Sequence, residues 1–411
     1  MTDTAAFRAI DFHSHHVPAR FEVTAGRTAP ANQQQRWQAL AQKLADEALL
    51  VKDIRDGTLS ARVVNIPAQL MAGADGRVPH QTIVAINDEV AALAARYPGK
   101  IYGFASVDGF DGDVSAHEAE RAIRELGLRG VFMDCARGDI MIDAPQARPT
   151  LETAARLNVP VFVHPVAPQA LTKQMAPYGV MGTLFARGTT NSASLIALIE
   201  GGVFSQLPNL RVVVTALAFG GLAMATALES ESRLDTGTIA VLRRNVWIDT
   251  MWPHPALIRA AVDLLGHEHV IAGSDWPIVD NDSVPGGLAQ AMQRAGIPGD
   301  QQRAIVAAIA GSSCAFDVSK LESGIDFLVH ANHIAAVGLD PQSPGRSKAC
   351  RPSTARCPLA GRGLFGDDLA STNSRPESEV PPVAQAAVVR ACDNRPVSWR
   401  TAKRCLVVPW R

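Results

Sequence analysis

The chain has 411 residues, with 39 basic and 40 acidic side chains and a formal net charge of −1. This balance gives no reason to expect nucleic acid or an anionic membrane surface as a partner. Aromatic residues make up only 5% of the chain, and six cysteines without a CxxC pair do not indicate a disulfide framework. The N-terminal segment lacks the cationic and apolar parts of a signal peptide, so we expect a cytoplasmic protein.

Short apolar runs alternate with longer segments of helical periodicity up to about residue 317. Helices are predicted, for example, over Gln81–Arg96 and Ser115–Leu126, where apolar side chains recur at helical spacing. This alternation predicts an α/β fold, a (β/α)₈ TIM barrel over residues 1–318. The alternative is a doubly wound open sheet, which would usually carry a glycine-rich phosphate loop after its first strand; the sequence there is DFHSHH. The predicted strands are Phe7–His13, Arg62–Pro67, Ile101–Val107, Gly130–Cys135, Val159–His164, Leu210–Thr215, Val246–Thr250 and Val270–Ser274.

One apolar segment, Val212–Leu228, carries no charge over 17 residues, which is at the short end for a membrane span. Its first half is β-branched and its middle holds Gly220-Gly221. These features favour a buried strand, a glycine turn and the start of a helix. We therefore expect no membrane segment.

The composition changes near the C-terminus. Residues 340–411 hold nine prolines and ten arginines, and no periodic apolar pattern continues there. This composition predicts an irregular, disordered extension over residues 319–411. A second interpretation is that this part of the gene is translated in an altered reading frame.

Four residues at predicted strand ends could hold a metal ion. His13 and His15 are two positions apart at the end of the first strand, so both imidazoles point the same way. His164 and Asp275 follow later apolar strands, and the carboxyl ends of barrel strands meet at one face. Taken singly, a histidine there could be a loop or core residue and the aspartate a helix cap. Together they predict a catalytic metal site, because three imidazoles and a carboxylate leave room for water or substrate on zinc.

These motifs resemble the amidohydrolase superfamily, in particular the branch similar to aminocarboxymuconate-semialdehyde decarboxylase. The resemblance covers residues 7–317 and rests on DFHSHHVP at 11–18, RAIRELGLRG at 121–130, VFVHP at 161–165 and GSDWP at 273–277. It implies one divalent metal ion, zinc or else manganese, held by His13, His15, His164 and Asp275. It also implies non-oxidative decarboxylation of a small unsaturated or aromatic carboxylic acid by a homodimer.

One departure from the family's pattern concerns proton transfer. The family normally has a histidine after the sixth strand, before a glycine pair, yet residues 212–221 (VVVTALAFGG) contain none. Losing a general acid or base typically costs on the order of 10²–10⁴ in rate. His80 and His254 could supply the proton from other loops, and Asp275 could shuttle one. Each histidine could equally be an ordinary surface residue.

The expected anionic substrate needs a cation to bind it. Arg187 and Arg62 are the candidates, although each could also be a solvated surface residue.

A decarboxylase-like lyase is the first functional hypothesis. A metal-dependent hydrolase of an ester, lactone or amide would tolerate the missing histidine better. A binding or scaffold protein that has lost catalysis is the third.

Overall fold

The computed structural model describes residues 8–21, 23, 31–73, 76–234, 236–279 and 283–307. The predicted C-terminal extension, 319–411, lies outside the described residues, as do residues 308–318 at the end of the predicted barrel domain. The domain boundary near residue 318 and the character of the extension therefore stay predictions.

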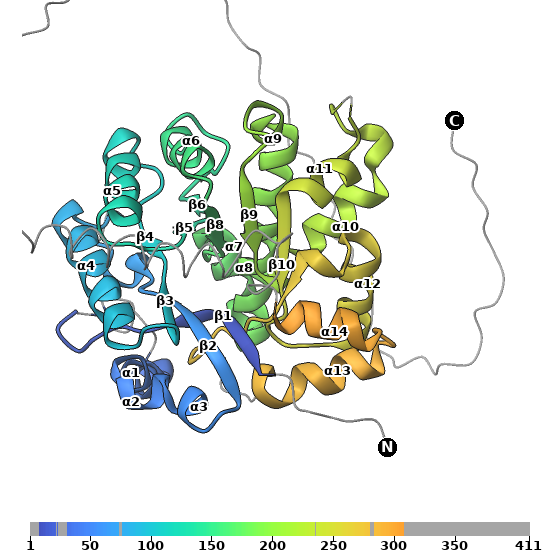
Figure 1. Cartoon of the computed structure of the whole chain (residues 1–411). Coiled ribbons are helices and arrows are strands. Elements are labelled where there is room, and N and C mark those ends of the chain that lie inside the picture. The colour runs from blue at the N-terminus through green and yellow to red at the C-terminus, as the bar shows by residue number, and fades with distance from the viewer. Residues whose placement is uncertain are drawn as a thin grey trace, which may run out of the picture. The chain divides into compact units, whose positions relative to one another are not determined.

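The described strands form a closed parallel barrel (Figure 1). β3 and β4 are halves of one barrel strand, because β3 pairs with β2 and β4 pairs with β5. The barrel closes where the Phe12 backbone N donates to Ala272 O at 2.8 Å and His15 N donates to Trp276 O at 2.8 Å. The TIM barrel is thus confirmed, with each predicted strand present. The barrel strands are β1 (Ala9–His15), β2 (Leu59–Asn65), β3 (Ile101–Gly103), β4 (Ala105–Ser106), β5 (Val131–Asp134), β8 (Pro160–His164), β9 (Arg211–Val214), β10 (Val246–Asp249) and β11 (Val270–Ile271).

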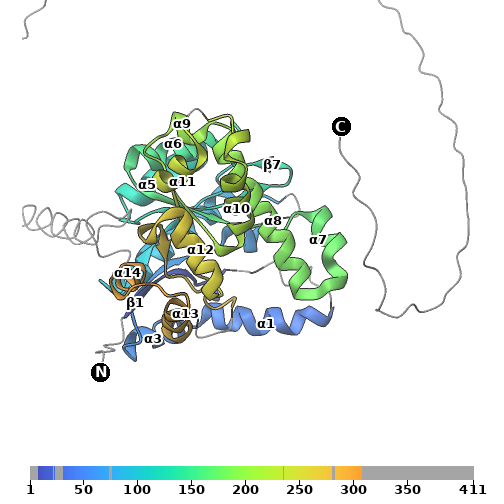
Figure 2. The ribbon, with the colours of Figure 1, turned by 90° about the vertical axis from the view of Figure 1, so that its right-hand side faces the viewer.

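Helices surround the strands, and a small antiparallel hairpin, β6 (Ala136–Arg137) with β7 (Ile140–Met141), follows β5. Figure 2 shows α7 and the start of α8 projecting beyond the other helices. The α-helices are α1 (Ala31–Ala45), α2 (Glu47–Leu50), α3 (Lys52–Arg55), α4 (His80–Arg96), α5 (Asp113–Arg124), α6 (Arg148–Leu157), α7 (Gln169–Met175), α8 (Gly179–Glu200), α9 (Val203–Gln206), α10 (Phe219–Ala227), α11 (Thr238–Asn245), α12 (Pro255–Leu265), α13 (Leu288–Arg294) and α14 (Gly299–Val306). Short turns of other helix types are η1 (Ala68–Met71), η2 (Ala176–Tyr178), η3 (Ala216–Ala218), η4 (Glu229–Glu231), η5 (His267–His269) and η6 (Ser283–Gly287).

The barrel interior is filled by an apolar cluster to which each barrel strand contributes one side chain. Its aromatic rings pack edge to face; the Phe12 and Phe104 centroids, for example, are 5.3 Å apart. Such packing fixes the floor beneath the carboxyl ends of the strands, since close-packed interiors leave side chains little freedom. His13 follows Phe12 directly, so the floor also positions the first candidate ligand. The cluster comprises Phe12, Val63, Phe104, Phe132, Phe162, Val213, Trp247 and Ile271.

The uncharged segment 212–228 forms β9, the turn η3 and the helix α10, as the sequence predicted. Glycine is required at position 221, because a Cβ there would lie 2.5 Å from the Ser192 carbonyl oxygen of α8. Among the described residues, no helix combines the length and apolarity that a membrane span needs.

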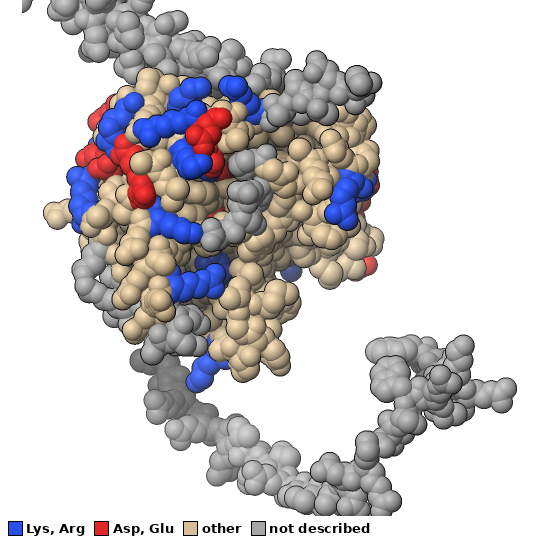
Figure 3. Space-filling model, turned by 90° about the horizontal axis from the view of Figure 1, so that it is seen from below, with Lys and Arg blue, Asp and Glu red and all other residues tan. Residues whose placement is uncertain are grey.

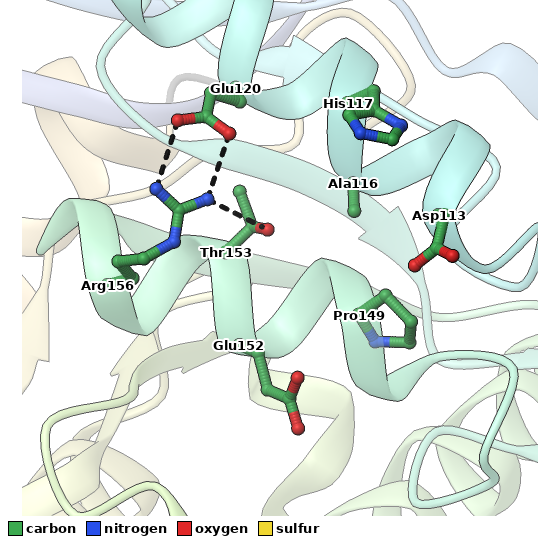
Figure 4. Close-up of a pocket in the computed structure, with 8 residues that line it drawn as sticks. All are labelled: Asp113, Ala116, His117, Glu120, Pro149, Glu152, Thr153 and Arg156. Atoms are coloured by element: carbon green, nitrogen blue, oxygen red, sulfur yellow. Dashed lines mark hydrogen bonds and ion pairs between the residues drawn. The ribbon is translucent and has the colours of Figure 1, made fainter. Parts of the chain in front are cut away.

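The outer surface carries mixed charge, and a hollow lies away from the strand ends. On the face seen in Figure 3, basic and acidic side chains intermingle over one side and a neighbouring area carries few charges. A hollow of about 450 Å³ lies between α5 and α6, where Arg156 forms an ion pair with Glu120 (Figure 4). It is bordered by Asp113, His117 and Glu152 and lies on the helical layer, so it does not mark the barrel mouth.

Arg62 does not lie in a substrate site, which corrects one of the sequence-based predictions. Its side chain is only 1% exposed. Its guanidinium forms ion pairs with Asp11 and Asp53 and donates to Leu50 O, and it lies over the Trp276 ring. These partners belong to β1, the α2–α3 region and the loop after β11. Arg62 thus ties the barrel seam together, and its buried guanidinium is directed to these partners rather than to a substrate.

We predict that Arg62→Met lowers the free energy of unfolding by about 3–5 kcal/mol, because it leaves the buried carboxylate of Asp11 without its cation. Denaturant unfolding would measure the change. Arg156→Met is the control, since the pair of Arg156 with Glu120 is solvent-exposed and its loss should cause no measurable change. Equal stability of the Arg62 variant and the unmodified protein would contradict the role given to this residue.

Candidate metal centre

Four buried side chains converge at the carboxyl ends of three barrel strands. His13 and His15 come from β1, His164 ends β8, and Asp275 follows β11. Each offers one ligand atom, and these atoms all lie within 4.8 Å of one another. Three of the separations are shorter still. His13 Nε2 is 3.2 Å from His15 Nε2, and Asp275 Oδ1 is 3.3 Å from the first and 3.0 Å from the second.

The hydrogen bonds on the far side of the two β1 imidazoles determine which nitrogens carry protons. His13 Nδ1 donates to Asp249 Oδ2 at 2.6 Å, and His15 Nδ1 donates to Asn65 Oδ1 at 2.8 Å. In a neutral imidazole the other nitrogen, Nε2, is then a lone-pair acceptor. When both imidazoles are neutral, the two Nε2 atoms therefore meet Asp275 Oδ1 as acceptors, and none of the three can donate to another.

A divalent ion satisfies this arrangement. Zinc bound at about 2.0–2.1 Å per nitrogen in tetrahedral geometry has ligand atoms roughly 3.3 Å apart, close to the observed separations. Three imidazoles and one carboxylate are donors that zinc and manganese both accept. The donor set and its spacing thus fit the ion that the sequence predicted.

The electrostatics of the cluster also favour a cation. Burial disfavours the protonated form of His13, but the carboxylates of Asp275 and Asp249 outweigh burial and raise its pKa. Burial likewise disfavours ionised Asp275, yet the neighbouring His13 and His15 lower its pKa. Burial lowers the pKa of His15 and, together with the charge of Arg187, lowers that of His164 well below the usual range. The ionised form of Asp275 and the neutral forms of His15 and His164 are thus favoured, as in metal ligands, and a bound metal ion would displace the proton that the carboxylates favour on His13.

Local backbone geometry brings Asp275 to the histidines. Its φ is +60°, a left-handed conformation that aspartate adopts more readily than most residues. Around it, Trp276 N donates to His13 O and His15 N donates to Trp276 O, so the loop after β11 is bound to β1 on both sides of the turn. This double attachment holds the carboxylate against the two imidazoles.

Arg187 is the second residue that the sequence predicted as a substrate contact. It sits half-buried in α8, and its charge acts on His164 and Asp275. No hydrogen bond or ion pair to another described residue is formed by its guanidinium. His80 begins α4 and His254 precedes α12; both are exposed and neither belongs to the convergent set.

His254 nevertheless borders the end of the sixth barrel strand. It lines a small cavity together with Ala216 and Asp249. Its Nδ1 accepts from Ala256 N at 3.2 Å, so its Nε2 carries the proton.

The residues after the sixth barrel strand, where the family has a histidine, form hydrogen bonds with neighbouring elements of the barrel. Thr215 Oγ1 donates to Asn191 Oδ1 at 2.8 Å, and Ala216 N donates to Asp249 Oδ1 at 2.7 Å.

Sequence reasoning missed three polar residues that end barrel strands. Asn65 ends β2, Asp134 ends β5 and Asp249 ends β10. A polar residue closing an apolar strand was the signal that identified Asp275, and the same signal was present at these positions. Burial raises the pKa of Asp134 to about 7. Gln69, in the turn after β2, was missed too; its amide lies 3.1 Å from His164 Nδ1.

Comparison with known proteins assigns the family. Residues 10–308 match the amidohydrolase family, and the chain belongs to it. A relative in Dictyostelium discoideum, 2-amino-3-carboxymuconate-6-semialdehyde decarboxylase, is 26% identical over 51% of this chain and 60% of its own length. The γ-resorcylate decarboxylase of Rhodococcus jostii is 26% identical over 46% of this chain and 64% of its own. The chain therefore spans less than two thirds of the length of these two relatives.

Solved structures show the same fold. The 5-carboxyvanillate decarboxylase of Sphingomonas paucimobilis has a TM-score of 0.64 at 20% identity, covering 73% of this chain and 97% of that one. The dihydroxybenzoic acid decarboxylase of Polaromonas, solved with manganese and the inhibitor 2-nitroresorcinol, has a TM-score of 0.61 at 20% identity, covering 73% and 94%.

We predict that Asp249→Asn weakens divalent metal binding about 10- to 100-fold, because the carboxylate that orients His13 and fixes its proton on Nδ1 is removed. Competition against a chelating dye would measure the dissociation constant. Asp300→Asn, which removes an exposed carboxylate of α14, is the matched control and should bind as the unmodified chain does. Unchanged affinity in the Asp249 variant would show that this hydrogen bond does not prepare the site.

Proposed function

We propose that this protein is a metal-dependent decarboxylase, a lyase that removes CO₂ from a small aromatic or unsaturated carboxylic acid. The observation that carries the proposal is the buried set of His13, His15, His164 and Asp275 with Arg187 beside it. An ion held by these four residues would take up a substrate oxygen by expanding to five-coordination. Decarboxylase relatives that share the fold support the reaction type.

The four residues named above would hold one divalent ion. When bound, such an ion supplies Lewis-acid chemistry, withdrawing charge from substrate oxygens. The sequence favours zinc, whereas the Polaromonas structure contains manganese; loading the protein with each metal separately would distinguish them. Arg187 would bind the substrate carboxylate through its guanidinium, whose planar fork suits a carboxylate.

Decarboxylation breaks the bond between the substrate carbon and its carboxylate, and a proton must replace the CO₂ that leaves. We assign this proton to His254 Nε2 rather than to His80. His254 lines the cavity that reaches Ala216, after the sixth barrel strand, and Asp249, at the end of the seventh. His80 does not line that cavity and does not belong to the four-residue cluster. Asp275, as a ligand that also accepts protons, would shuttle a proton if the reaction were hydrolytic.

Metal-loaded protein should release CO₂ from at least one member of a panel of hydroxylated and unsaturated carboxylic acids. The physical reason is that Arg187 would hold the carboxylate in a fixed orientation, while a metal ion held by the four ligands would withdraw the negative charge that the C–C bond cleavage leaves on the substrate. Gas-phase CO₂ detection with metal-free protein as the control would measure this.

Ester, lactone and amide substrates belong in the same assay, because the lack of a histidine in residues 212–221 favours a hydrolase as the second candidate. Hydrolysis without CO₂ release would contradict the decarboxylase proposal and support that alternative. If the protein binds metal and turns over none of these substrates, the non-catalytic interpretation replaces both.

We predict that His254→Gln reduces the rate of CO₂ release on the order of 10²- to 10⁴-fold while metal content stays unchanged, as loss of a general acid does. His117→Gln is the control, because His117 lies beside the hollow between α5 and α6. A His254 variant with full activity would remove this residue from the mechanism, and testing His80→Gln would then follow.

The homodimer and the cytoplasmic location remain predictions from the sequence. Exposed apolar side chains at the projecting start of α8, such as Met181 (76% exposed) and Phe185 (59% exposed), are compatible with an additional contact. Light scattering on the purified protein would give the oligomeric state.

A further inference from the structure

Asp134 places a second carboxylate beside the metal centre. It is the last residue of β5 and is the register partner of His164 on β8. Its Oδ1 lies 3.8 Å from His164 Nδ1. The side chain remains 24% exposed although Oδ1 itself is buried, so part of this side chain at the carboxyl end of β5 is accessible.

Nothing in the described part of the chain donates a hydrogen bond to Asp134 Oδ1. The 3.8 Å separation from His164 Nδ1 is too long for one. The imidazole nitrogen already faces the Gln69 amide at 3.1 Å. Buried polar atoms in folded proteins are nearly always hydrogen-bonded, so an unpaired one beside a reactive centre indicates a partner that is not part of the protein.

The charges around Asp134 define that partner. Arg187 is near enough to act electrostatically on Asp134 but forms no ion pair with it. Asp108, the other carboxylate nearby, is engaged by Arg137 and by the Phe110 backbone N. Two charged groups here thus have no hydrogen-bond partner among the described residues: the guanidinium of Arg187 and Oδ1 of Asp134. In its ionised form Asp134 can only accept, so it repels a second anion and selects a ligand group that donates.

We propose that Asp134 is a specificity-determining residue that accepts a hydrogen bond from a hydroxyl group carried by the substrate close to its carboxylate. The inference rests on the proposed function for the premise that the substrate is a carboxylic acid. It goes further by selecting hydroxy acids over their deoxy counterparts. Arg187 meets the carboxylate and Asp134 meets the hydroxyl, so the pair fixes the orientation of the ligand on the metal.

The test compares the binding of 2-hydroxybenzoate and benzoate to metal-loaded protein by calorimetry. The unmodified protein should prefer 2-hydroxybenzoate, and Asp134→Leu should reduce the affinity ratio about 10- to 100-fold, as expected for a lost hydrogen bond to a charged group. The affinity for benzoate should not fall. Because the ratio is compared between variants, any contact of the hydroxyl with the metal cancels.

Asp108→Asn is the matched control, since it removes a neighbouring negative charge that is already paired and should leave the ratio unchanged. Asp134→Asn keeps an acceptor without the charge and should lower the ratio by a smaller factor. It decides the question if the leucine variant does not fold, because an unchanged ratio would then overturn the proposal.

An equal ratio in Asp134→Leu and in the unmodified protein, at equal metal content, would overturn the assignment, as would an unmodified protein without preference for the hydroxy acid. Failure of the decarboxylase proposal has a separate signature. Binding selectivity that depends on Asp134, in a protein that releases no CO₂, would leave this inference standing and remove only the reaction.

Discussion

The convergence of three acceptors on one point is the constraint on which the site depends. His13 Nε2, His15 Nε2 and Asp275 Oδ1 lie 3.0–3.3 Å apart in a buried place, and all three are acceptors when the imidazoles are neutral. Such an arrangement costs free energy unless a cation occupies its centre. The fold maintains it through the Asp249 and Asn65 hydrogen bonds and the closure of β1 against the loop after β11. A divalent cation at this point would remove that cost.

Much of this could be predicted from the sequence because the relevant signals are local. An apolar run that ends in a polar residue marks the carboxyl end of a barrel strand, and parallel strands bring these ends to one face. His164 and Asp275 were found in this way and the structure brings them together with His13 and His15. The same signal, applied evenly, would also have identified Asp134 and Asp249. The strand pattern likewise predicted the closed barrel, including the strand, turn and helix of segment 212–228.

The remainder depends on contacts between distant parts of the chain, which a single sequence does not encode locally. Asp249 reaches His13 across 236 positions, and Arg62 pairs with Asp11 across 51. Arg62 was therefore interpreted as a substrate contact although it holds the barrel seam. The proton-transfer group raises the same difficulty. The family has a histidine after the sixth barrel strand, and this segment of the chain, which includes Ala216, has none. Ala216 and His254 line the same cavity, which is the observation that points to His254 as the proton donor instead.

The central claim is that these four residues bind a divalent ion, and metal content tests it most directly. The purified chain, loaded separately with zinc and with manganese and freed of excess, would be assayed by inductively coupled plasma mass spectrometry. The account predicts one tightly held ion per chain and none in a His13→Ala, His15→Ala double variant that remains folded. A folded, unmodified chain that retains no divalent ion after reconstitution would contradict it.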